Sequence, residues 1–176
     1  MTLDAIKGLL IHELRDIYGA DTLLLKALPR MARGVTHPVL REVLQTHVQE
    51  TEAQLDRLDA ICSAFAVNPR GQRSLGMEGL VDQGADVLIT RGGSRMVDAA
   101  MIAWARRIEH YEMAAYSSAR TYALLLGMDQ VVVLLTKGHA ECQATDARLG
   151  TIAGEHLTES FESDALSGVA QDPGSR

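Results

Sequence analysis

The segment from Val97 to Ala119, VDAAMIAWARRIEHYEMAAYSSA, decides the fold. Its apolar side chains recur at intervals of three and four residues, which is the spacing of one face of an α-helix. That face consists of Val97, Met101, Trp104 or Ala105, Ile108, Glu112, Ala115 and Ala119. A carboxylate buried alone on such a face costs several kcal/mol unless it binds a cation or stays protonated. The segment therefore predicts a buried helix in which Glu112 belongs to a polar site.

The same periodicity extends along most of the chain and predicts four long helices. They are expected from Thr2 to Gly34, from Pro38 to Phe65, from Met96 to Leu126 and from Asp129 to about His156. Pro29 is expected to kink the first helix or to begin a short turn. A glycine-rich connection over 71–93 is expected to hold one short helix, from Met77 to Ile89. Two short loops and one long crossover predict an all-α, ferritin-like four-helix bundle.

The length and composition set the broad class of the protein. A chain of 176 residues suits one domain, which we place at residues 1–157, followed by a poorly ordered tail at 158–176. A net charge of -6 argues against a nucleic-acid partner, because phosphates attract basic side chains. No apolar run approaches 18 residues, and the first residues lack a basic signal region, so we expect neither a membrane span nor a secretory signal. With two distant cysteines, a reducing cytoplasm is the expected location.

Each predicted long helix carries metal-ligand side chains near its middle, at a spacing that places them on one face. The candidates are Glu13 and Asp16 in the first helix, His47 and Glu50 in the second, Glu109 and Glu112 in the third, and Glu141, Cys142 and Asp146 in the fourth. Carboxylates and imidazole from four facing helices are the ligands of di-iron and di-manganese bundles. A single such pair is most simply explained as part of a solvent-exposed helix face. Four pairs at similar heights favour a metal site.

At these residues the sequence resembles the YciE/YciF family of ferritin-like bacterial stress proteins. The matching segments are residues 13–21, 26–31, 47–51, 98–102, 107–116 and 144–149. The most specific of them is Glu-His-Tyr-Glu followed by Ala-Ala-Tyr, and the resemblance covers about residues 3–155. It implies a ferritin-like fold, a homodimer and a place in the bacterial stress response. Members of the family are often labelled ferroxidases, by analogy of fold.

Two positions depart from the family pattern. The family usually has glutamate where this chain has Asp21, and it usually has a second glutamate where this chain has Cys142. If Cys142 faces inward, a soft thiolate replaces a hard carboxylate, which could weaken iron binding, favour zinc or leave a redox-sensitive cysteine at the site. If Glu141 faces inward, the change is nearly silent.

The sequence therefore leaves two main hypotheses about function. The first is a metal-binding stress-response protein, with iron as the expected metal and manganese or zinc as alternatives. Its enzymatic role would be to oxidise ferrous iron with dioxygen or peroxide at a carboxylate-bridged dinuclear site. The second is a non-enzymatic helical dimer or interaction module that has lost its metal. A cage-forming iron store is a weaker third option, because the resemblance implies dimers.

Overall fold

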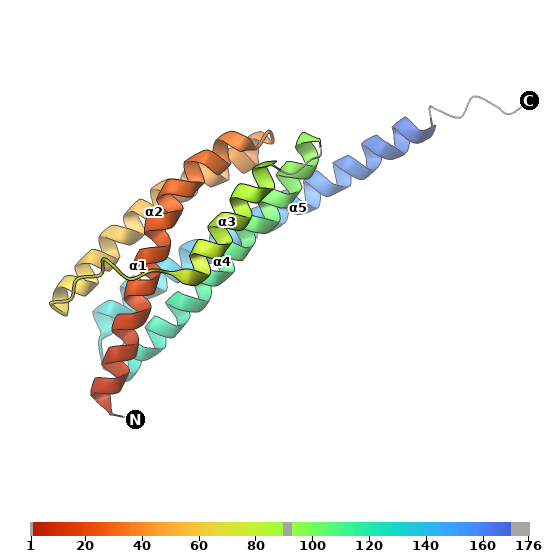
Figure 1. The fold of residues 1–176 in the computed structure, drawn as a ribbon. Helices are drawn as coiled ribbons and strands as arrows, with labels where there is room; N and C mark the ends of the chain where they lie inside the picture. The colour runs from red at the N-terminus through yellow and green to blue at the C-terminus, as the bar shows by residue number, and fades with distance from the viewer. Residues whose placement is uncertain (1, 90–92, 170–176) are drawn as a thin grey trace, which may run out of the picture.

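The computed structural model describes residues 2–89 and 93–169, with side chains described as far as residue 155. The described residues lie mostly in α-helices and contain no strand, which confirms the all-α class (Figure 1). The helices are α1 (Leu3–Gly34), α2 (Pro38–Ala64), α3 (Leu75–Ile89), α4 (Ser94–Leu125) and α5 (Asp129–Val169). None of the described helices is both long enough and apolar enough to cross a membrane.

Local signals in the sequence set the helix ends. The Thr2 hydroxyl accepts a hydrogen bond from the Ala5 amide and caps α1. Pro38 occupies the first turn of α2, where a missing amide hydrogen costs nothing. Gly127 follows α4 with φ at +68°, a left-handed conformation that glycine adopts without steric cost. These three ends match the sequence predictions.

Two features of the helices differ from the sequence predictions. Pro29 does not begin a turn, because α1 continues through it to Gly34. The last helix does not end near His156, because α5 continues to Val169. Residues 157–167 contain neither proline nor glycine, so no local signal ends the helix there. The predicted tail is therefore helical up to residue 169, and its remainder, 170–176, lies outside the described residues.

The four long helices form two antiparallel hairpins, α1–α2 and α4–α5. The hairpins pack together with α1 against α4 and α2 against α5. α2 and α4 run in the same direction, so the chain must return along the bundle between them (Figure 1). α3 lies within this return and packs on α1 and α4. This connectivity is the ferritin-like topology that the long crossover predicted.

α3 is held against α4 at one close contact. The Trp104 indole donates a hydrogen bond of 2.6 Å to the carbonyl of Leu80, and the ring itself is fully buried. Gly84 lies against the same ring, where an added Cβ would come within 2.5 Å of Trp104 Cε2. The absence of a side chain at Gly84 therefore lets α3 approach the bundle.

We expect Gly84→Ala to lower the free energy of unfolding by about 1–3 kcal/mol, because the new methyl group overpacks this contact. Gly79→Ala is the matched control in α3, since an added Cβ there meets nothing within 4 Å. The control should be stabilised by up to about 1 kcal/mol, owing to the better helix propensity of alanine. Urea unfolding, followed by tryptophan fluorescence, measures both variants. Equal stability of the two would show that α3 does not depend on this contact.

The core consists of two apolar clusters separated by a layer of polar side chains. One cluster includes Leu24, Leu28, Leu44, Met101 and Ile108, and the other includes Leu10, Leu14, Leu58, Ala119 and Leu135. Between them, the buried polar residues are Asp21, His47, Thr51, Gln54, Glu109, Glu112 and Thr145. Because all four long helices contribute to this layer, the polar site lies at the middle of the bundle.

Candidate metal centre

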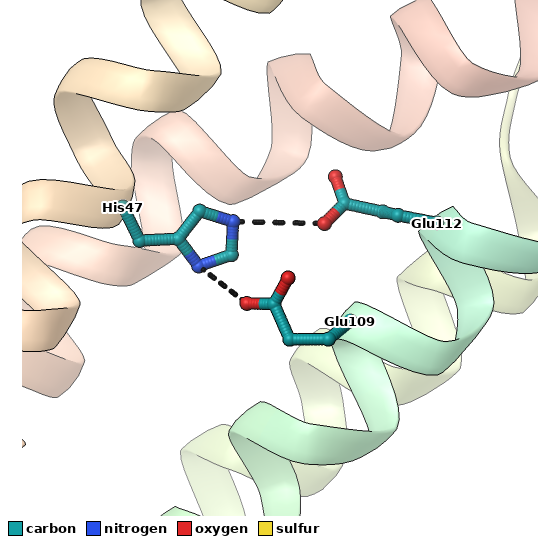
Figure 2. Close-up of side chains that lie close together, drawn as sticks. All are labelled: His47, Glu109 and Glu112. Carbon is teal, nitrogen blue, oxygen red and sulfur yellow. Dashed lines mark ion pairs between the residues drawn. The ribbon is translucent and has the colours of Figure 1, made fainter. Parts of the chain in front are cut away.

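Three of the predicted ligands meet in the polar layer. His47 projects from α2 between Glu109 and Glu112, which stand one turn apart on α4 (Figure 2). Nδ1 of His47 lies 3.1 Å from Oε1 of Glu109, and Nε2 lies 3.5 Å from Oε2 of Glu112. One donor atom from each residue lies within 4.8 Å of the other two, as the ligands of a single ion would. The i, i+3 spacing on α4 accounts for the pairing of the two carboxylates.

Burial and the neighbouring charges together shift the pKa values of His47 and Glu109. All three side chains are almost fully buried. Burial alone would lower the pKa of His47, but the carboxylates of Glu109 and Glu112 outweigh it and raise that pKa to about 9. Burial raises the pKa of Glu109, although the nearby imidazolium partly opposes the shift. The two carboxylates therefore favour the protonated, cationic form of His47.

Many polar atoms of this layer have no hydrogen-bond partner in the described part of the chain. These atoms are both carboxylate oxygens of Asp21 and of Glu109, Oε1 of Glu112, Nε2 of His47 and Oε1 of Gln54. Buried polar groups are normally satisfied, so a group of unsatisfied atoms indicates a missing ion or other ligand. Their nitrogen and oxygen chemistry suits a divalent transition metal such as iron, manganese or zinc. The residues present therefore fit the metal that the bundle fold implies.

Glu50 stands at the edge of this cluster. It lies on α2, is half-buried and accepts a hydrogen bond of 3.1 Å from the Thr145 hydroxyl on α5. Its charge raises the pKa values of both His47 and Glu109, after stronger effects from other groups. Glu50 is therefore near the cluster, and its role as a ligand stays a prediction.

Glu13 and Asp16, the predicted ligands on α1, lie outside the His47 cluster. Asp16 accepts a hydrogen bond of 2.5 Å from the Tyr111 hydroxyl, which also contacts the Ser74 hydroxyl at 2.9 Å. Glu13 is half-buried, and its pKa is raised by burial and then by the charge of Asp16. The structure places this pair where α1 meets α4 and the loop before α3, and does not bring it into the His47 cluster.

On the fourth long helix, α5, Cys142 is the residue that faces the core. It is 2% exposed, and its Sγ lies 3.9 Å from Oε2 of Glu112. Burial and then the charge of Glu112 raise the pKa of its thiol. Glu141 instead pairs with Arg57, and Asp146 with Arg106 at 2.7 Å. Of the two neighbouring residues that the sequence left open, Cys142 therefore faces the core and Glu141 does not.

Asp21 is a buried acid of the polar layer that the predicted ligand set left out. It is fully buried, and its pKa is raised by burial and then by the charge of Glu112. A signal for it does exist, because Leu14, Ile17, Asp21, Leu24 and Leu28 form one helical stripe. In contrast, Glu13 and Asp16 lie beside that stripe. Glu112 was selected because it is an acid within an apolar helical stripe, and the same criterion applies to Asp21.

Comparison with known proteins places the chain in a family. Residues 5–162 match a family described as a domain of unknown function, DUF892. The chain is 31% identical to protein YciF of Escherichia coli K12, over 94% of this chain and the full length of that protein. The chain belongs to the YciF family. This confirms the resemblance carried by the Glu-His-Tyr-Glu segment.

Solved structures agree with the assignment of this chain to the YciF family. The crystal structure of the E. coli stress protein YciF superposes with a TM-score of 0.84 and covers 87% of this chain and 97% of that one. A protein named YcfI from Rhodopseudomonas palustris is 34% identical, with a TM-score of 0.80 over 87% of this chain and 96% of that one. A protein from Xanthomonas campestris, 15% identical over 92% of this chain and 99% of that one, shares the fold with a TM-score of 0.71.

Proposed function

We propose that this YciF-family protein binds a divalent transition-metal ion, with iron first and manganese or zinc as alternatives, at the cluster of His47, Glu109 and Glu112. The observation that carries this proposal is the convergence of three buried ligand atoms within 4.8 Å, in a layer where both oxygens of Glu109, Oε1 of Glu112 and Nε2 of His47 have no hydrogen-bond partner among the described residues. A purely structural layer at this depth would be expected to satisfy its own polar atoms. A bound cation would satisfy them instead.

We further propose a stress-related oxidase role, in which bound iron supplies redox chemistry toward dioxygen or peroxide. The E. coli relative is described as a stress protein, which supports this part of the proposal. The protein's own contribution would be to hold the ion at the middle of the bundle and to exclude bulk water from it. Cytoplasmic location and a homodimer belong to the same proposal.

A second candidate function is a metal-free helical module. It is favoured by the two ion pairs of His47, which balance part of the acidic charge without an ion. In that case the remaining acids would stay protonated, as the raised pKa values of Asp21 and Glu109 allow. The two functions differ in whether a cation stabilises the fold.

Metal titration of the chelator-treated protein separates the two candidates. With anaerobic Fe²⁺ at a hundred times its dissociation constant, we expect stabilisation of about 2.7 kcal/mol, or a rise in Tm of roughly 5–10 °C. Mn²⁺ and Zn²⁺ are titrated in parallel, and His47→Ala should remove most of the effect. Loss of ferrous iron together with consumption of dioxygen tests the oxidase role separately. No bound ion and an unchanged Tm with all three metals would exclude the metal proposal and leave the metal-free module.

A further inference from the structure

A row of polar contacts joins α2 to α5. Glu50 of α2 accepts a hydrogen bond of 3.1 Å from the hydroxyl of Thr145, a buried residue of α5. One turn further along α2, the side-chain amide of Gln54 lies 3.4 Å from Glu141, which also pairs with Arg57. Glu50, Glu141 and Arg57 are only partly buried. The seam between α2 and α5 therefore carries polar side chains from the surface of the bundle to its middle.

A groove opens in the same seam, beside the hydrogen bond between Glu50 and Thr145. It has a volume of about 450 Å³, and its polar lining includes Glu42 and Thr46 of α2 and Arg148 and Glu155 of α5. Thr46 precedes Glu50 by one helical turn, and Arg148 follows Thr145 by about one turn. Because α2 and α5 are in contact and run antiparallel, both steps lead in the same direction along the seam. One end of the groove therefore meets Glu50 and Thr145.

Glu50 belongs both to this seam and to the surroundings of the proposed metal site. It stands one turn from His47 on the same face of α2, since residues three apart in a helix are neighbours. Its charge raises the pKa values of His47 and Glu109, so the carboxylate acts on two of the proposed ligands. Unlike those two residues, Glu50 is only half-buried. An ion in the groove can thus reach Glu50 before it reaches the buried cluster.

The charges beside the groove favour a cation. Glu42, Glu50 and Glu155 contribute three carboxylates, and Arg148 contributes one guanidinium, so negative charge is in excess. A cleft with an excess of one sign of charge concentrates ions of the opposite sign and speeds their association. The groove therefore suits a hydrated divalent cation and should repel an anionic chelate of the same metal.

Two other approaches to the polar layer are blocked by packed side chains. The two apolar clusters lie on either side of the layer along the bundle. The seam between α1 and α4 is covered by α3, which packs on both helices. Beside α3, the Tyr111 hydroxyl contacts both Asp16 and Ser74 and closes the edge of that seam. An ion that approaches along the bundle axis or from the side of α3 therefore meets no open path.

We propose that the metal enters through the α2–α5 groove as a hydrated divalent cation, and that Glu50 is a transfer ligand on its way to the cluster of His47, Glu109 and Glu112. The inference rests on the proposed metal function and adds the route by which the site is filled. Before an ion arrives, the Thr145 hydroxyl holds the Glu50 carboxylate across the seam. The carboxylate then replaces part of the water around the ion, which lowers the cost of moving the charge into the buried layer.

Charge reversal at the groove tests the route. Glu42→Lys combined with Glu155→Lys is compared with Glu52→Lys combined with Asp82→Lys, a control pair with the same change in net charge at equally exposed positions. The chelator-treated protein is mixed with Co²⁺ in a stopped-flow instrument, and binding is followed by the quenching of Trp104, the single tryptophan. At low salt we expect the groove pair to slow association about tenfold more than the control pair does. The difference should shrink at high salt, which screens exposed charges.

Glu50→Gln tests the transfer role, because glutamine keeps the shape of the side chain without its charge. A transfer ligand lowers the barrier in both directions, so association and the release of Co²⁺ to a chelator should each slow about tenfold, with Kd nearly unchanged. Faster release with a raised Kd would show that Glu50 is a final ligand and would refute the transfer role. A groove pair that binds Co²⁺ as fast as the control pair would refute the route, while binding by the unmodified protein would keep the metal function standing. Failure of the unmodified protein to bind Co²⁺, Zn²⁺ or Fe²⁺ at equilibrium would refute both.

Discussion

Replacing Glu112 with glutamine is expected to abolish metal binding and, at the same time, to stabilise the metal-free protein. Glu112 contacts His47 on one side and Cys142 on another, and it belongs to the cluster that we propose to bind the ion. Its loss should weaken binding of the ion by more than about 100-fold, because even outer partners contribute 10–100-fold. Without metal, the substitution removes one of several crowded buried acids and keeps the shape of the side chain. We expect about 1–3 kcal/mol of added stability.

The sign of the stability change distinguishes a metal site from a structural ion pair. If the pairing of His47 with Glu112 exists to hold the bundle together, removal of one partner should cost about 3–5 kcal/mol. Urea unfolding in the presence of a chelator measures this sign, and calorimetry measures the binding. Glu52→Gln is the matched control, since Glu52 is exposed on α2 and should affect neither property. A destabilised Glu112→Gln variant that still binds metal would contradict the proposed site.

The sequence predicted the fold well because the deciding signals are local. Helical periodicity, the cap at Thr2, the proline at Pro38 and the glycine at Gly127 each act within a few residues. Glu109 and Glu112 could be selected because they lie on or next to a clear apolar stripe. The end of α5 could not be predicted, since a polar but unbroken segment can either continue or leave a helix.

The orientation of residues on α5 was the part of the site that the sequence left open. Adjacent residues on a helix are about 100° apart, so Glu141 and Cys142 could not be assigned to inside and outside by spacing alone. Their long-range partners decide it: Arg57 of α2 pairs with Glu141, and Glu112 of α4 contacts Cys142. Glu13 and Asp16 have the spacing of ligands but lie outside the cluster, and Asp16 instead accepts a hydrogen bond from Tyr111. Such partners are set by tertiary packing and have no signature within the helix itself.

The metal-free protein should lose stability as the pH rises, which is the reverse of ordinary acid denaturation. The pKa of Asp21 is raised by burial and by Glu112, that of Glu109 by burial, and that of His47 to about 9 by its two carboxylates. The folded state therefore holds more protons than the unfolded chain between pH 4 and pH 9, and its free energy of unfolding falls across that window. We expect a loss on the order of 2–4 kcal/mol between pH 5 and pH 8, measured by urea unfolding with a chelator present.

Asp21→Asn should reduce this loss, because asparagine keeps the shape of the side chain and cannot ionise, while the part that depends on Glu109 remains. The later part, near pH 9, should remain, since it depends on His47. Asp82→Asn is the matched control on the exposed face of α3 and should leave the whole profile unchanged. Metal should act in the opposite direction, because its ligands must first lose these protons, so its affinity rises over the same window. A metal-free protein whose stability rises from pH 5 to pH 8 would show that the buried acids are already ionised, and that the polar layer balances its charge without a cation.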